Sequence, residues 1–335
     1  MKKKIINFLF LIVLSLGLSS CVISEKHIDQ SQDLYLRENN KIYFGKYPQT
    51  EVKDSYLINE LNTLAGNKPT LKSTYNWTYY NYYILSSISN FMFYQDIDYD
   101  KDGIYDYRGV CFTQYRPFHY HCSPIKDGSY QDDNGYLTNT IYWFSYDPIE
   151  WDILKEENDK SLIISNLILD SQEYYSSYSI ETFDHNGGYG YANNYELSKI
   201  RKFLNDNFYN TAFNELQKEI IEITTVDNSA KSTVSDSNIY ACNDTNDKMF
   251  LLSYKEAITY YLSDSKRETQ GSDYAKSQGL YVNSSDMNSY WWLRSPCNYN
   301  GDRANGVLKD GRVDNDYCHV FKTYFGVRVA CQIIL

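Results

Sequence analysis

The stretch from Pro148 to Leu154, PIEWDIL, alternates apolar and acidic residues with a period of two. Side chains of a strand point alternately to opposite faces, so this pattern predicts a strand with one buried and one wet face. The segment 161–169 is more continuously apolar and predicts a more deeply buried strand. Two further strands are expected, at 41–52 and at 249–252, and the first of them should be broken at Pro48.

Helical signals are interspersed with these strands. Apolar residues from 194 to 208 recur at helical spacing, and Asn214 is a suitable N-cap for a helix that reaches Ile221. Ser253 and Glu256 have the spacing of a capping box, which predicts a helix to about residue 262. The sequence shows no internal repeat and no heptads.

The first residues predict export. Three lysines precede an apolar run from Ile5 to Leu18, and small residues then lead to Cys21. This layout is typical of a secretory signal and is short for a membrane span. It resembles a bacterial lipobox, so we expect a signal peptide at 1–20, a lipid on Cys21, a flexible tether at 21–40, and a membrane-anchored protein on the cell surface. An ordinary signal peptide with a chance cysteine is the alternative.

The charge of the chain limits its partners. The formal net charge is −11, and loss of the three N-terminal lysines would make it −14. Such a chain repels phosphate backbones, so we expect no nucleic-acid partner.

Six cysteines remain once Cys21 is set aside. An even number in an exported protein permits disulfides, and the pairs Cys111–Cys122 and Cys297–Cys318 would each close a short loop. Six reduced thiols are the alternative.

The stretch from 98 to 106 is the sharpest local motif. It fits D-x-D-x-D-G-x-x-D, which wraps oxygen ligands around one point, as calcium requires. The position of an EF-hand's bidentate glutamate is occupied by Gly109, which indicates a shorter loop with a structural rather than catalytic ion. A solvated acidic turn is the alternative. The expected ligands are Asp98, Asp100, Asp102, the carbonyl of Ile104, and Asp106.

No catalytic constellation is evident. Glu150 and Asp152 lie two apart on one strand, about 7 Å from each other by strand geometry, and such a pair could serve glycoside hydrolysis. We interpret them as the wet face of the strand that carries Trp151. We therefore expect no enzymatic activity and no organic cofactor.

The tail from Trp291 places polar residues between apolar strands. Arg294 and Arg328 lie within these strands and are expected to be buried with carboxylate partners. The expected core residues are Trp291, Leu293, Val307, Val313, Val327 and Val329. The hairpin turn is expected at 309–312.

Polar and aromatic loops on a rigid scaffold are a common design for binding sites, and these side chains suit sugars or protein surfaces. Solvated turns are the alternative. The expected ligand-binding residues are Asn298, Tyr299, Asn300, Asp302, Arg303, Asn315, Asp316, Tyr317 and His319.

Several motifs together resemble one large bacterial family of unknown function. They include FGKYPQT (44–50), WFSYDPIEWDIL (143–154), KMFLLSYKEA (248–257), WWLRSP (291–296) and GVRVA (326–330). The resemblance implies a mixed α+β domain with a C-type-lectin-like fold, which formylglycine-generating enzymes share. In this fold two helices pack on small twisted antiparallel sheets.

In this fold the domain would span residues 41–335. Residues 60–140 would be an insertion, and residues 146–335 would form the main body. The strand at 41–52 would lie close to 326–335. We expect a surface lipoprotein that binds a glycan or protein ligand through its C-terminal loops. The alternatives are an enzyme of formylglycine-generating type or one acting on envelope glycans, a structural envelope protein, and a surface receptor diversified by a retroelement.

Overall fold

A computed structural model describes residues 34–70, 72–85, 88–112, 134–175, 184–185, 188–315 and 318–335. The largest sheet has eight strands and is antiparallel throughout. Its strands are β1 (Leu36–Glu38), β2 (Lys41–Glu51), β3 (Thr78–Leu85), β4 (Ile88–Ile97), β5 (Tyr107–Phe112), β6 (Ile141–Glu157), β7 (Lys160–Ser165) and β17 (Ala330–Ile334).

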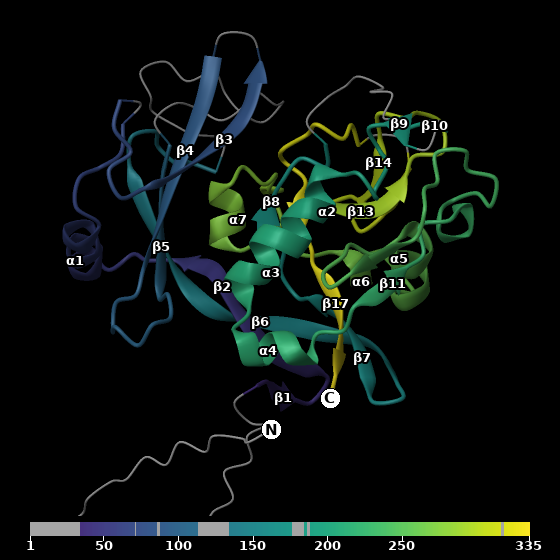
Figure 1. Ribbon diagram of the computed structural model, residues 1–335, viewed down its shortest axis with the longest axis horizontal. Helices are drawn as coiled ribbons and strands as arrows, with labels where there is room; N and C mark the ends of the chain where they lie inside the picture. Colours follow the sequence, from purple (N-terminus) through teal and green to yellow (C-terminus); the bar gives the residue numbers. More distant parts are fainter. Residues whose placement is uncertain are drawn as a thin grey trace, which may run out of the picture.

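Strand β6 joins the two halves of this sheet (Figure 1). It has 17 residues, and one of its edges pairs with β2. Its other edge pairs with β5 along the first half and with β7 along the second. Ile149 and Trp151 are fully buried, and the Trp151 indole donates to the carbonyl of Phe44 at 2.7 Å. The strand predicted at 148–154 is therefore confirmed, although it extends further in both directions.

The predicted break at Pro48 is wrong. Strand β2 continues through it, and Pro48 pairs with Tyr146. The register shifts between Pro48 and Thr50, which marks a bulge. A proline has no backbone N–H to donate to the ladder, and a bulge next to it lets the strand continue.

The resemblance implied that the strand at 41–52 lies close to 326–335, and this expectation is also wrong. Strands β6 and β7 lie between β2 and β17. The reason is local: Asn158 and Asp159 have φ of 50° and 62°, the backbone of a tight hairpin turn that brings β7 directly back along β6. β17 then pairs with the remaining edge of β7.

A five-stranded sheet carries the tail, and its order is β15-β14-β13-β16-β8. Its pairs are antiparallel except for β13 with β16. Its strands are β8 (Asp170–Ser171), β13 (Trp291–Pro296), β14 (Ala304–Val307), β15 (Val313–Asp314) and β16 (Gly326–Val327). The smaller pairs are β9 (Asp184–His185) with β10 (Gly188–Tyr189), and β11 (Thr224–Val226) with β12 (Thr245–Asp247).

The helices are short. They are α1 (Ser55–Ala65), α2 (Lys199–Phe203), the π-helix η2 (Leu204–Phe208), α3 (Tyr209–Ala212), α4 (Glu215–Ile220), the 3₁₀ helix η3 (Ala230–Ser232), α5 (Tyr254–Tyr260), α6 (Asp264–Arg267) and α7 (Asp273–Ser277).

Both predicted caps are confirmed. Asn214 forms a capping box with Gln217, and Ser253 forms one with Glu256. Helix α4 buries no residue fully, and its Leu216 is 62% exposed. The described residues form more helices than the two implied, and the main sheet is not small. The chain is thus a mixed α and β structure with several antiparallel sheets.

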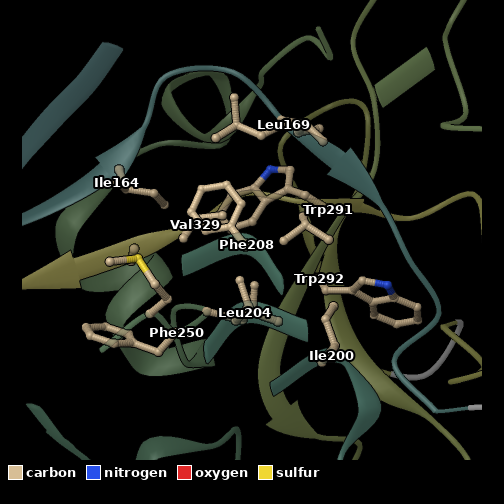
Figure 2. Packing of buried hydrophobic residues seen from close by; sticks show 14 of the residues in the cluster. Ile164, Leu169, Ile200, Leu204, Phe208, Phe250, Trp291, Trp292 and Val329 are labelled. Carbon is tan, nitrogen blue, oxygen red and sulfur yellow. The ribbon is translucent and has the colours of Figure 1, made fainter. Parts of the chain in front are cut away.

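Figure 2 shows the main core, where Ile200, Leu204 and Phe208 of the helical segment meet Trp291 and Trp292 of β13. All five are fully buried. Trp292 is buried alongside Trp291 because β13 is covered on both faces. Of the predicted tail core only Val313 is partly exposed.

A second, smaller core lies under α1. It consists of Leu61, Ala65, Trp77, Phe93, Ile97, Cys111 and Trp143. The segment expected to be an insertion, 60–140, therefore has its own apolar cluster, yet strands β3 to β5 extend the main sheet.

Among the residues that the structure describes, no helix is long and apolar enough to cross a membrane. The expected signal peptide and Cys21 lie outside the described residues.

Candidate ligand-binding and metal sites

The Asp-rich motif forms the loop between β4 and β5, residues 98–106. Carboxylate oxygens of Asp98, Asp100 and Asp106 all lie within 4.8 Å of one another. Lys101 and Gly103 have φ of 66° and 94°, so the chain turns sharply enough to bring these side chains together.

Hydrogen bonds within the loop hold the three carboxylates in place. The Gly103 amide donates to Asp98 Oδ2 at 2.9 Å, and the Tyr99 amide donates to Asp106 Oδ2 at 2.7 Å. Asp98 Oδ1 is buried and has no hydrogen-bond partner. A buried, unpartnered carboxylate oxygen among other carboxylates is costly without a cation, so this donor set fits calcium.

One expected ligand, Asp102, is arranged differently, and the position of the EF-hand glutamate is closed by a neighbouring ring. Asp102 is not part of the cluster, because its Oδ1 accepts from the Ile104 amide at 2.8 Å. Gly109, at the position of an EF-hand glutamate, lies against the Trp143 ring, where a Cβ would come within 2.8 Å. A twelfth-position carboxylate would not fit there.

In the tail, two loops come together as expected. The Val320 amide donates to the Asp302 carbonyl at 3.0 Å, and His319 Nδ1 lies 3.1 Å from Asp302 Oδ2. The Asn298 amide donates to the side chain of Asn315 at 3.3 Å. Burial lowers the pKa of His319 despite the opposing attraction of Asp302. Asp316 and Tyr317 lie outside the described residues.

Residues that the sequence analysis missed hold loop 298–303 in place. The buried Asn193 donates from its amide to the carbonyls of Asn300 and Arg303, both at 2.9 Å. The Tyr191 ring covers Gly301 so closely that a Cβ there would lie 2.4 Å from the ring. The only signal in the sequence was a concentration of Tyr and Asn at 189–195, 107 residues before Asn300.

An aromatic surface adjoins this loop. Tyr299 is 64% exposed, and the Tyr240 hydroxyl donates to its carbonyl at 3.3 Å. Tyr191 and Tyr240 meet edge to face at 4.7 Å. The loop thus presents an exposed aromatic ring on a held backbone.

Cys297 and Cys318 are not joined by a disulfide, contrary to expectation. The Cys297 amide bonds to Arg303, whereas Ala304 bonds to Cys318, so a stretch of chain runs between the two cysteines. Residues two strands apart in a sheet are separated by about 9–10 Å, which is beyond the reach of a disulfide. Cys111 is unbonded and buried in the small core, and burial raises its pKa to about 12. Cys122 lies outside the described residues.

Both tail arginines have carboxylate partners, as predicted. Arg294 pairs with Glu256, and Arg328 lies 3.4 Å from Asp152. Lys41 contacts Glu150 and lies 3.6 Å from Asp152, so cations flank this pair of acids. Charge-paired carboxylates favour the interpretation as the wet face of a strand.

Comparison with known families gives one match. Residues 158–335 match the model of a domain of unknown function, DUF6273, which is more than half of the chain. No curated protein and no solved structure is significantly similar. The chain belongs to the DUF6273 family.

Proposed function

We propose that the chain is an exported, lipid-anchored bacterial surface protein whose C-type-lectin-like domain binds a glycan or protein ligand without converting it. The observation that carries the proposal is the fixed loop 298–303, in which Asn193 and Tyr191 hold the backbone while Tyr299 faces solvent. Rigid support beneath an exposed aromatic ring reduces the entropy lost on binding.

Calcium has a structural part in this proposal. Asp98, Asp100 and Asp106 would hold the ion, which would provide the missing partner of Asp98 Oδ1. The ion would stabilise the hairpin of β4 and β5. That hairpin and the tail strands β13 and β14 lie on opposite sides of the molecule in Figure 1, so calcium would act on stability rather than on the tail loops.

The non-catalytic part of the proposal rests on the cysteines. An enzyme of formylglycine-generating type needs a reactive cysteine, and Cys297 and Cys318 are both 0% exposed. Burial raises the pKa of Cys318 well above its ordinary value, which suppresses the thiolate.

The test uses the ectodomain from residue 26 on glycan and protein arrays, with calcium and with chelator. The double variant Tyr299→Ala/Asn300→Ala is compared with Tyr56→Ala, a control that removes a 71% exposed tyrosine from α1. We expect the double variant to lose the signal and the control to keep it. The absence of a binding signal in every condition would overturn the binding proposal. A signal that survives in the double variant would exclude the tail loops as the binding site.

A further inference from the structure

A polar cavity of about 510 Å³ lies along the β2–β6 ladder. The loop that follows β7 and the segment that leads into α7 close its sides. Its volume is in the range of small-ligand sites. It is lined by Tyr43, Gln49, Thr50, Asp147, Pro148, Glu150, Asn166, Leu167, Gln270, Gly271, Ser272 and Asp273.

A second cavity of about 420 Å³ adjoins the first, and Tyr43 and Pro148 line both. Its other walls include Leu34, Leu36 and Phe44, so it is the more apolar of the two. Together the two cavities can accommodate an extended ligand whose polar end lies in the first.

The amide nitrogens of both glutamines in the polar cavity are already used as donors. The Gln49 amide nitrogen already donates to the carbonyls of Asp147 and Pro148, at 2.9 and 3.1 Å. The Gln270 amide nitrogen donates to the Asp286 carbonyl at 2.9 Å. Three lining residues are carboxylates, and none is a lysine or an arginine. A complementary ligand must therefore carry hydrogen-bond donors.

The three carboxylates differ in whether a cation is paired with them. Glu150 is paired with Lys41, and Asp273 lies 3.0 Å from Lys276. Asp147 accepts only neutral donors, the Thr50 amide at 3.1 Å and the Ser145 hydroxyl at 2.8 Å, and it forms no ion pair with any described residue. Asp147 thus leaves one uncompensated negative charge in the cavity.

The Tyr43 ring lines the same cavity as Asp147. The Tyr43 hydroxyl donates to Glu150 Oε2 at 3.2 Å, which fixes the ring at the junction of the two cavities, next to the exposed Pro148. A fixed tyrosine ring suits the carbon face of a pyranose.

We propose that this groove binds an amino sugar with a free primary amine. The ammonium pairs with Asp147, the sugar hydroxyls donate to the amide and carboxylate oxygens of the walls, and the carbon face lies on Tyr43. An acetylated amine carries no charge and forfeits the charge-assisted hydrogen bond. The site is independent of the tail loops and adds a second binding surface to the protein.

The test measures binding of a glucosamine trimer to the ectodomain from residue 26 by calorimetry, beside its fully N-acetylated counterpart. We expect the free-amine trimer to bind at least about tenfold more tightly, and Asp147→Asn to remove that preference. Asp206→Asn, which removes an exposed charge from η2, is the matched control and should bind as the wild type does.

Asp147→Asn keeps one acceptor oxygen for the Thr50 amide, and the Ser145 hydroxyl can accept from the new amide nitrogen instead of donating. The melting temperature of this variant should confirm that it folds. If it does not fold, Tyr43→Ala decides, with an expected loss of about tenfold for both sugars. The Tyr299→Ala/Asn300→Ala variant should leave this affinity unchanged, which separates the groove from the tail site. No binding, equal affinity for the two trimers, or an undiminished preference in folded Asp147→Asn would overturn the proposal.

Discussion

Arg294 and Glu256 form a two-point ion pair beneath the tail, with Nη2 and Oε1 3.0 Å apart. Arg294 is 2% exposed and also donates to the carbonyls of Leu251 and Asp227. Glu256 at the same time accepts from the Ser253 amide at 2.8 Å and completes the capping box of α5. One carboxylate therefore fixes both the start of a helix and the charge inside β13.

Replacing Glu256 by glutamine should destabilise the protein by about 2–4 kcal/mol, because a buried guanidinium loses its counter-charge. Chemical denaturation measures the loss. Glu219→Gln, which removes an exposed carboxylate from α4, is the control and should change the free energy of unfolding by less than about 0.5 kcal/mol. Equal effects of the two variants would contradict the assigned role.

Acid should weaken the same contact. Burial tends to raise the pKa of Glu256, but attraction and hydrogen bonds from Arg294 outweigh it and lower the pKa below its ordinary 4.5. A lowered folded-state pKa gives stability that is present above the unfolded value and lost as pH falls through the folded one. Below about pH 4.5 the wild type should therefore lose stability more steeply than Glu256→Gln, as denaturation at stepwise lower pH would measure. Parallel curves for the two proteins would refute this.

Gly311→Ala should disrupt the tail hairpin. Gly311 has φ of +75°, and a Cβ there would lie 1.8 Å from the backbone oxygen of Asp264 in α6. Gly66→Ala is a matched control, because Gly66 has φ of +74° and nothing within 4 Å of the added carbon. The control should lower the free energy of unfolding by about 1–3 kcal/mol from backbone strain alone. Gly311→Ala should lower the free energy of unfolding by about 1–3 kcal/mol more than the control does, as thermal or chemical unfolding would measure. Equal losses in the two variants would show that the clash is relieved.

Calcium should raise the melting temperature of the ectodomain, and chelator should reverse the effect. An ion at about 100 times its dissociation constant stabilises by about 2.7 kcal/mol. Asp98→Asn should abolish the response, because it weakens the cluster at its buried oxygen. Asp102→Asn, a change in the same loop outside the cluster, should keep it. Loss of the response in both variants would show that the cluster of three is not the site.

Peptide mapping of the oxidised, exported protein should find no Cys297–Cys318 crosslink, because a stretch of chain separates the two residues. The readout is the mass of the alkylated peptides without reduction. A linked peptide would mean that the tail sheet rearranges.

The features that local chemistry decides were predictable. The period of two at 148–154, the caps at Asn214 and Ser253, and the turn at Gly311 each depend on residues a few positions apart. The convergence of Asp98, Asp100 and Asp106 was likewise readable from spacing.

Contacts between distant segments were not predictable. Nothing near Asn300 in the sequence indicates that Asn193 holds it, and nothing near Asp147 shows that Gln270 lies across the same cavity. The Cys297–Cys318 prediction failed for the same reason, since loop length alone does not show that a strand runs between the two residues. The partners of Arg294 and Arg328 were expected by charge but could not be named.

The hairpin of β6 and β7 has a consequence for how the family segment can be handled. The match begins at residue 158, in the turn after β6, and so includes β7 and its partner β17 but not β6, which pairs with the other edge of β7. Expressed alone, residues 158–335 would expose one edge of β7 and the apolar faces of Ile163 and Ile164, which are fully buried in the whole chain. An open edge of this kind recruits strands from other molecules. A fragment that keeps this edge of β7 covered must therefore begin no later than β6, at Ile141.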